Sequence, residues 1–506
     1  MPASSASASI SRLGWRLTAG TLLIYLSTAG GSLATKDAVV MFEQTRHMID
    51  DRTFALPVQF LGDRSQIGVD GRSYSPFGIG QSIYNVPFFL AGRAVKAAGF
   101  ARAIPDDALT KAVVALGGTV ASAAVVGLSF LLAWRLTGDP GASATAAILV
   151  AFGTLLWPYS KFGFNAPLAA LGVTATVYLV LVAAASGRTR AAILAGVSLA
   201  CALLTRHELM LMLIPIAGWW WLETNARRAT WKTFVPFGFC IAAGLACWAS
   251  YNYVRFGSPL RAGYRPAFGV GGVIGFLLSP EGSVLLYMPI VVAGIWGLSV
   301  LVARRVPAAT LLALVSTTLF AFYASLADWL GTRSYGPRYL VAITPLLVAP
   351  AAALLAAHAG STTRALTLAC GLTSAIIQVP AVLVDFTKVR IDTLAGEGHV
   401  PYRASERPLA ASSIVRTVRR AGELVPANAE YLSGRRQPPA GRPDASLGDR
   451  FAFSLDLWWM YLIYMRVLRA AAAFAAGLIP LAAGVWLVGS AAARAPRLVV
   501  TASADA

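Results

Sequence analysis

Charged residues are scarce in this sequence: Asp, Glu, Lys and Arg make up only 13% of its 506 residues, whereas 57% are hydrophobic. Soluble globular proteins have about 25% charged residues, so this class is excluded. The uncharged stretches come in blocks of about 20 residues, the length of a helix that crosses the hydrocarbon core of a bilayer. The apolar–polar alternation of strands is also missing. We therefore predict an all-α polytopic membrane protein, because a helix satisfies its own backbone in lipid.

Cysteines and known catalytic motifs are scarce as well. The four cysteines lie in apolar stretches, with no Cys-x-x-Cys pair and no histidine nearby: Cys201, Cys240, Cys247 and Cys370. This arrangement predicts neither a disulfide framework nor a zinc site. No P-loop, Gly-x-Ser-x-Gly or His-Glu-x-x-His motif is present. We expect no metal site and no required cofactor, and a role for a divalent metal ion is left open.

Charge-poor apolar stretches predict about twelve membrane-spanning helices. They cover residues 14–33, 112–134, 140–160, 162–187, 191–205, 209–222, 233–254, 282–303, 306–327, 339–357, 365–384 and 470–493. Residues 209–222 are short for a span, so the chain around Arg206 is predicted to bend or to insert only partly. Residues 79–99 contain Arg93 and Lys96 and favour an interfacial amphipathic helix over a further span.

The basic residues predict the orientation. With the N-terminus in the cytoplasm, the short Arg- and Lys-rich loops face the cytoplasm, as the positive-inside rule requires. In an alternative interpretation the N-terminal segment is a signal peptide, since residues 32–34 resemble a cleavage site. The predicted location is a membrane, with the functional loops on its external side. The net charge of +19 then reflects basic loops beside membrane lipids and not nucleic-acid binding.

This orientation places the long polar segments outside. The first external loop, residues 34–110, is expected to carry juxtamembrane helices. Residues 386–455 are rich in Pro, Arg and Ala and predict a loosely structured external region with a short amphipathic patch at residues 413–424. The expected organisation is a membrane module at residues 1–385, this external region, and an interfacial segment, last span and cytoplasmic tail at residues 456–506.

Asp37 is the first acid after the first predicted span, and two interpretations are open for it. It caps the helix predicted at residues 38–49, which is a common use of Asp. Alternatively, it is a general base at the boundary between membrane and water. The local sequence does not decide between the two.

Two arginines stand beside apolar stretches, where an unpaired charge is costly. Arg206 either pairs with Glu208 or binds the phosphate of a lipid-linked substrate. Arg338 either reaches the lipid headgroups or holds a phosphate by bidentate hydrogen bonds. Tyr335, close to Arg338 in sequence, is an interface aromatic in the simplest interpretation.

Five features occur in order along nearly the whole chain. They are an early Asp after the first span, Gly-Arg-Ser-Tyr-Ser-Pro-Phe-Gly-Ile-Gly-Gln-Ser, Trp-Pro-Tyr-Ser-Lys followed by Pro-Leu-Ala-Ala-Leu, Asn-Tyr-Val-Arg-Phe-Gly-Ser-Pro, and Ser-Tyr-Gly-Pro-Arg-Tyr-Leu. In these features the chain resembles bacterial membrane glycosyltransferases of the GT-C class. These polyprenyl-phosphate-dependent enzymes include protein O-mannosyltransferases and lipid A aminoarabinose transferases. The resemblance implies a GT-C-like helix bundle but no particular sugar.

The resemblance also implies roles for individual residues. Asp37 occupies the catalytic acid position of the family's first external loop. Lys161, Arg206 and Arg338 match positions where relatives carry basic or polar residues near the carrier phosphate. Asn165 departs from the family, because relatives often have an acid there, and this weakens a mechanism with two carboxylates. Candidates for substrate binding in the same motifs are Tyr74, Gln81, Asn165 and Tyr335.

The reaction implied is transfer of a sugar from a polyprenyl-phosphate donor to a hydroxyl of a lipid, polysaccharide or protein acceptor. Polyprenyl phosphate leaves as a stable anion, so cations can stabilise it without a general acid. Asp37 then takes the proton of the acceptor hydroxyl, and inversion at the sugar carbon is expected. A transporter or flippase is the main rival, but charges near the membrane midplane are too few to favour it. A non-catalytic binder of lipid-linked saccharides is left open by Asn165.

Overall fold

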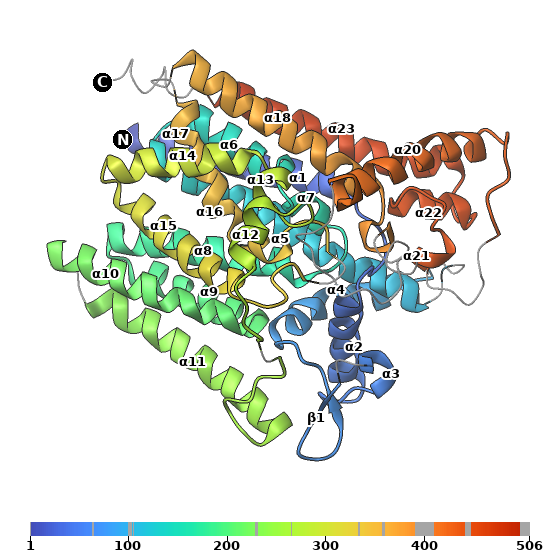
Figure 1. Ribbon diagram of the computed structural model, residues 1–506, viewed down its shortest axis with the longest axis horizontal. Helices are drawn as coiled ribbons and strands as arrows, with labels where there is room; N and C mark the ends of the chain where they lie inside the picture. The colour runs from blue at the N-terminus through green and yellow to red at the C-terminus, as the bar shows by residue number, and fades with distance from the viewer. Residues whose placement is uncertain are drawn as a thin grey trace.

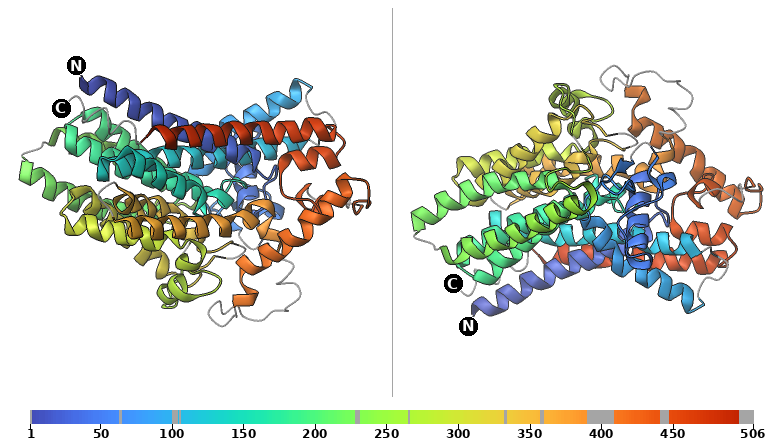
Figure 2. Two further views of the ribbon diagram at one scale, coloured as in Figure 1. Left: turned by 90° about the horizontal axis from the view of Figure 1, so that it is seen from above. Right: turned by 90° about the horizontal axis from the view of Figure 1, so that it is seen from below.

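The computed structural model describes residues 2–62, 65–99, 104, 106–227, 231–264, 266–331, 334–356, 360–389, 409–440 and 447–495. Long helices lie side by side and form one bundle (Figures 1 and 2). They are α1 (Pro2–Ser27), α5 (Asp106–Thr137), α6 (Pro140–Phe152), α8 (Asn165–Ser186), α9 (Thr189–Thr205), α10 (Leu213–Arg227), α11 (Trp231–Phe256), α14 (Ile290–Ala303), α15 (Pro307–Ala324), α18 (Ser361–Leu383) and α23 (Ala470–Arg494).

Shorter elements connect or cover these helices. The α-helices are α2 (Lys36–Asp50), α3 (Val58–Leu61), α4 (Gly80–Ala97), α7 (Leu156–Tyr159), α12 (Gly272–Leu278), α13 (Val284–Tyr287), α16 (Thr344–Val348), α17 (Ala352–Leu355), α20 (Ser413–Leu432), α21 (Leu447–Arg450) and α22 (Trp458–Tyr464). The 3₁₀ helices are η2 (His207–Met212), η3 (Arg338–Ala342), η4 (Ala349–Ala351) and η6 (Leu409–Ala411). Strands β1 (Gln66–Ile67) and β2 (Ser73–Tyr74) pair antiparallel, with Gln66 opposite Tyr74.

Several described helices suit a bilayer. Six are long and apolar enough to cross one, namely α5, α8, α11, α15, α18 and α23, and shorter apolar helices include α6, α9 and α14. Each of the predicted apolar stretches coincides with helical structure. The prediction of an all-α polytopic membrane protein is therefore confirmed.

Some predicted spans are interrupted. The stretch 140–160 divides at Gly153, which ends α6 before α7 begins. The stretch 339–357 is a series of short helices with prolines at their starts, Pro345 and Pro350. Proline removes a backbone donor and breaks helical continuity. Residues 340–343 are fully buried, so protein and not lipid surrounds this irregular backbone.

The polar segments gather at one end of the bundle, opposite the end at which α1 begins (Figure 1). We call this the loop end; it comprises α2, α3, α4, the two strands and α20 to α22. Helix α4 lies there and packs against α5. This position agrees with the prediction that residues 79–99 do not add a span.

Helix α20 is longer than the amphipathic patch predicted at residues 413–424. Its residues Ala421 and Leu424 pack with Val384 beyond the end of α18. An amphipathic helix is stabilised mainly by such packing, and so α20 differs from the loosely structured region that composition predicted. The same prediction for residues 390–408 and 441–446 lies outside the described residues.

A buried carboxylate fixes the start of α20. Glu281 is fully buried and accepts hydrogen bonds from Ser413 Oγ at 2.7 Å and from Arg416 Nη2 at 2.6 Å. Burying a carboxylate is favourable only when it is paired and hydrogen-bonded in this way. The pair therefore ties α20 to the segment that leads into α13.

Candidate active site

Asp37 lies in the first turn of α2 but does not cap it. The residue before the helix, Thr35, is the N-cap, and its hydroxyl oxygen accepts a hydrogen bond from the Ala38 N–H at 3.1 Å. The capping interpretation of Asp37 is therefore wrong, because a side chain outside the helix already fills that role. Asp37 is only 8% exposed, and a carboxylate buried to this extent needs a charged or hydrogen-bonding partner.

One such partner is an arginine from the far end of the sequence. Asp37 Oδ2 lies 3.5 Å from Arg338 Nη1, and both side chains are nearly buried. Arg338 begins η3, directly after the Gly336-Pro337 turn. Folding thus joins the first and last of the five motifs. A buried pair of this kind is costly to break, since the remaining charge loses its partner.

Gly331 and two aromatic rings surround Arg338. A Cβ on Gly331 would come within 2.2 Å of Arg338 Nε. Gly331 also has a φ of +70°, a conformation that favours glycine. The guanidinium lies 5.4 Å from the centre of the Phe164 ring and 5.0 Å from that of Tyr339. Arg338 Nε is buried without a hydrogen-bond acceptor. Such a donor is unusual in a folded protein and is suited to an anion that enters the site.

Arg206 contacts the ring of the same tyrosine, Tyr339. Its guanidinium lies 5.6 Å from the centre of the Tyr339 ring, and Arg206 is 7% exposed. Nε and Nη2 donate to Asn165 Oδ1 at 3.3 and 3.0 Å, whereas Nη1 is buried without an acceptor. The structure therefore brings Asp37, Arg338, Arg206 and Asn165 into one region.

The alternative pairing of Arg206 with Glu208 is wrong in the described structure. Arg206 ends α9 in an extended conformation, whereas Glu208 is in the first turn of η2. Glu208 instead accepts a hydrogen bond from Tyr323 OH at 3.4 Å. Arg206 donates to Asn165 instead, a partner that spacing in the sequence could not reveal.

Sequence reasoning missed three aromatic members of the site: Phe164, Tyr264 and Tyr339. The ring of Tyr339 contacts the guanidinium groups of both Arg206 and Arg338. Its hydroxyl accepts from Arg338 Nη2 at 3.3 Å. Burial, followed by the nearby Tyr339 and Asp328, raises the pKa of Tyr264 to about 12. Tyr339 belongs to the last of the five motifs and Phe164 lies within the third, and these positions are the signal that could have identified them.

Lys161 lies in a different environment. It is fully buried, and its Nζ is 2.9 Å from Asp456 Oδ2, which is also buried. Nζ also donates to the backbone oxygen of Val382. These contacts join the Trp-Pro-Tyr-Ser-Lys motif to the C-terminal region. They differ from the predicted contact of Lys161 with a donor phosphate.

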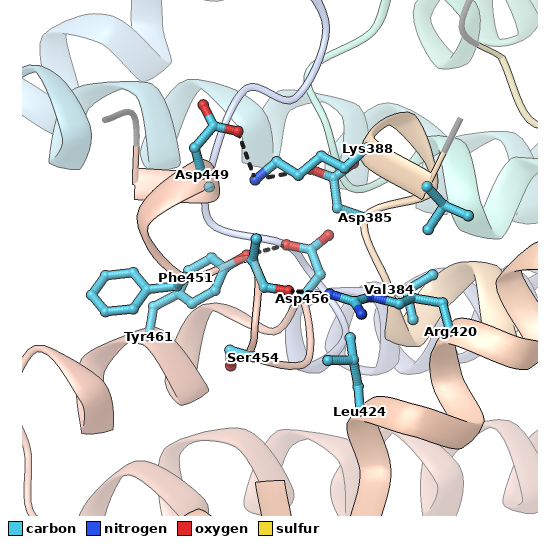
Figure 3. Close-up of a pocket in the computed structure, with 13 residues that line it drawn as sticks. Val384, Asp385, Lys388, Arg420, Leu424, Asp449, Phe451, Ser454, Asp456 and Tyr461 are labelled. Atoms are coloured by element: carbon cyan, nitrogen blue, oxygen red, sulfur yellow. Dashed lines mark hydrogen bonds and ion pairs between the residues drawn. The ribbon is translucent and has the colours of Figure 1, made fainter. Parts of the chain in front are cut away.

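Beside this pair, a cavity of about 150 Å³ opens at the loop end between α18, α20 and α22. Figure 3 shows Lys388 between two carboxylates, those of Asp385 and Asp449. Asp456 accepts a hydrogen bond from Tyr461 OH at 2.6 Å. Burial and the neighbouring Asp456 raise the pKa of Asp385 to about 6. Opposite charges balance here, so the cluster is a structural junction with a pH-sensitive member.

The other substrate-binding candidates are held by internal contacts. Tyr74 donates to Asp70 Oδ2 at 2.8 Å. Gln81 Nε2 donates to Asn85 Oδ1 at 2.9 Å, and its Oε1 is buried without a donor. Tyr335 is fully buried, and its hydroxyl donates to the backbone oxygen of Ile377 at 2.8 Å. Among the described residues, no group of three or more His, Cys, Asp or Glu is arranged to hold a metal ion.

One family model matches the sequence. Residues 103–253 match the model described as dolichyl-phosphate-mannose-protein mannosyltransferase. The matched segment includes Lys161, Asn165 and Arg206 but ends before Arg338 and begins after Asp37. No curated protein matches the chain.

Solved structures give weaker similarities. ArnT from Cupriavidus metallidurans matches in the apo state, with a TM-score of 0.48 and 14% identity over 92% of this chain and 75% of ArnT. The same protein bound to undecaprenyl phosphate matches with a TM-score of 0.45 and 14% identity over 93% and 76%. The archaeal oligosaccharyltransferase AglB from Archaeoglobus fulgidus matches with a TM-score of 0.43 and 13% identity over 87% and 60%. TM-scores this low do not establish a shared function.

The family match covers the middle of the chain, and the ordered motifs extend on both sides of it. The two agree on the same class of protein. The predicted resemblance to protein mannosyltransferases that use a polyprenyl-phosphate donor is therefore confirmed over residues 103–253.

Proposed function

We propose that this protein transfers a sugar from a polyprenyl-phosphate donor to an acceptor hydroxyl, with Asp37 as general base and inversion at the sugar carbon. The observation that carries the proposal is the ion pair between Asp37 and Arg338, 3.5 Å apart at the loop end of the bundle. This contact supports the proposal because the carboxylate proposed as the base lies beside the cation proposed to bind the leaving phosphate. The acceptor is a lipid, a polysaccharide or a protein.

The two arginines provide the electrostatic part of the mechanism. Arg338 and Arg206 both contact Tyr339, and each has a buried N–H group without an acceptor. Preorganised donors of this kind stabilise the charge that develops on the leaving phosphate. When the donor phosphate binds Arg338, the hold of Arg338 on Asp37 weakens. The carboxylate then becomes available to the acceptor hydroxyl.

Asn165 supports the proposal, although it departs from the family. Its amide oxygen accepts two hydrogen bonds from Arg206 and orients the guanidinium without neutralising it. An acid at this position would form an ion pair with Arg206 and compete with phosphate. The amide thus keeps the positive charge available. In this mechanism a single carboxylate is sufficient, because the phosphate leaves without being protonated.

Proton removal and inversion are linked. When the deprotonated acceptor hydroxyl displaces the phosphate directly, without a covalent intermediate, the configuration of the sugar carbon is inverted. A general base contributes about 10²–10⁴-fold to the rate. The donor sugar should therefore change its anomeric configuration in a single transfer step, which NMR of the product measures. Retention of configuration would contradict the proposed mechanism.

The central experiment is transfer of a labelled sugar from polyprenyl phosphate in reconstituted vesicles. Asp37→Asn should reduce turnover about 10²-fold or more while donor binding and folding persist. Asp50→Asn is the matched control, since Asp50 ends the same helix and pairs with Arg93 near the surface. A fully active Asp37→Asn protein would remove Asp37 from the mechanism. Donor binding without any transfer by the wild-type protein would indicate a non-catalytic binder.

We also propose that the loop end faces the periplasm of a bacterial inner membrane and that the N-terminus is cytoplasmic. Positively charged loops at the other end support this orientation. Arg72 at the loop end and Arg188 between α8 and α9 are both exposed. Each is replaced by a single cysteine. An impermeant thiol reagent added to intact cells should label the first and not the second. Labelling of Arg188→Cys alone would reverse the orientation.

A further inference from the structure

The connection between α11 and α14 contains a stretch that is unusual for a loop in water. Residues 266–280 contain no charged side chain and no histidine. Within them, the exposed fraction is 97% for Val270, 67% for Phe268 and 63% for Ile274. A contiguous apolar surface of this kind marks an interaction site, since its exposure to water is unfavourable.

Helix α12 has two distinct faces. Gly272, Gly275 and Phe276 are buried, whereas Val273, Ile274, Leu277 and Leu278 are the exposed positions. A Cβ on Gly272 would come within 2.2 Å of the Ala324 backbone oxygen, and one on Gly275 within 2.3 Å of the Trp329 ring. The small residues therefore bring α12 close against the protein. Apart from the buried Phe276, the large apolar side chains of α12 are exposed.

The stretch is also firmly held in place. The Gly269 N–H donates to Ser325 O at 2.8 Å, and the Ala327 N–H donates to Ala267 O at 2.8 Å. Phe276 packs edge-to-face on Trp329 with ring centres 5.3 Å apart. The exposed apolar side chains thus belong to an ordered segment and not to a loose one.

The position of α12 identifies what covers it. Helix α12 packs against the end of α15 at which Ala324 lies, and α15 is long and apolar enough to cross a membrane. Figure 2 shows the segment projecting from the side of the bundle near the loop end. The exposed face of α12 therefore lies beside the end of a helix that is suited to cross a membrane. A short apolar helix at this level is suited to the membrane interface.

We propose that residues 268–278 insert into the bilayer leaflet at the loop end and bind the glycerol and upper acyl region of its phospholipids. This anchor holds the adjoining residues Tyr264 and Trp329 at the membrane surface, where aromatic side chains are favourable. Tyr264 lies near Arg338 and Asp328, so the anchor fixes the depth of the candidate site in the membrane. The inference is independent of the proposed sugar transfer.

The test measures which quencher reaches a fluorescent probe on the full chain in phosphatidylcholine vesicles. The four native cysteines are replaced, and single cysteines at Val270 and Ile274 are labelled. The matched control is Val69, a 67% exposed valine in the first loop beside the charged Asp70 and Arg72. Probes at 270 and 274 should be quenched several-fold more by lipids with a spin label high on the acyl chain than by aqueous iodide. The probe at 69 should show the reverse order.

Two results would overturn the inference. Iodide quenching at positions 270 and 274 equal to that at 69 would mean that the stretch lies in water. Protection from both quenchers, or quenching that changes with the ratio of protein to lipid, would mean that protein covers the face. Because the measurement needs no donor or activity, its failure is distinguishable from a failure of the proposed function.

Discussion

The carboxylate of Asp37 lies 3.5 Å from the Nη1 atom of Arg338, although the two residues begin and end the series of motifs along the chain. The pair lies at the loop end of the bundle and is nearly buried. Arg338 in turn shares the ring of Tyr339 with Arg206. One base candidate and two cations therefore form one site, and this arrangement allows the roles of these residues to be separated by experiment.

The first prediction separates capping from catalysis on α2. Thr35→Ala removes the N-cap and should lower the free energy of unfolding by about 1 kcal/mol, with turnover per folded molecule nearly unchanged. Asp37→Asn should leave unfolding nearly unchanged and reduce turnover. Thermal unfolding and sugar transfer, measured on both variants, check this. Equal loss of stability in the two variants would return Asp37 to a structural role.

The second prediction concerns Arg338. Arg338→Ala should weaken donor binding by roughly 10-fold or more, since a hydrogen bond to a charged group contributes about 1.5–3 kcal/mol. Arg338→Lys should recover part of this affinity, because lysine keeps the charge but not the planar fork. Titration of a fluorescent polyprenyl-phosphate analogue measures the affinity. Unchanged affinity in Arg338→Ala would leave Arg338 only as the partner of Asp37.

The third prediction uses the departure at Asn165. Asn165→Asp keeps the shape of the side chain but places a carboxylate against Arg206. The new ion pair should compete with the donor phosphate for Arg206. Donor binding should weaken about 10-fold, because a hydrogen bond between Arg206 and the charged phosphate is lost. Asn165→Gln, which remains neutral, is the control for size. An Asp variant that binds donor more tightly would contradict the role given to Asn165.

The fourth prediction concerns Lys161 and Asp456, whose side chains are 2.9 Å apart and buried. Lys161→Met alone leaves a buried carboxylate without its cation and should destabilise the fold by about 3–5 kcal/mol. Combining it with Asp456→Leu should restore much of this loss. Donor affinity of the folded double variant should match that of the wild type. A specific loss of donor binding would instead support the phosphate-binding role predicted from the motif.

The fifth prediction is a dependence of stability on pH. The pKa of Asp385 is raised to about 6, chiefly by burial, whereas an unfolded Asp has a pKa of about 4. The folded state therefore binds the proton more tightly, and the contribution to stability is full below pH 4 and is lost as pH rises through 6. In the Asp385→Asn variant, the midpoint of unfolding should therefore change less between about pH 4 and 6 than in the wild type. If the variant and the wild type show the same pH dependence of stability, another group causes that dependence.

Sequence reasoning located the helices well. Long uncharged stretches such as 112–134 and 470–493 lie in α5 and α23, because the bilayer imposes a length and a polarity on every span. It also singled out Asp37, Arg206 and Arg338, which the fold brings into one region. It did not foresee the contact of Lys161 with the distant Asp456, because a lysine in a motif has the same local sequence whether it meets a ligand or a buried acid. Composition likewise underestimated α20, whose order comes from packing against α18.

What the sequence by itself determined is therefore the class of protein: a polytopic helical membrane protein with charged motifs between its spans, since apolar length and charge are local properties. Tertiary structure alone decided which charges meet. The 3.5 Å contact of Asp37 with Arg338 and the 2.9 Å contact of Lys161 with Asp456 each join segments far apart in the chain. A buried charge must find a partner, but the partner is selected by how the helices pack, and no local pattern contains that information.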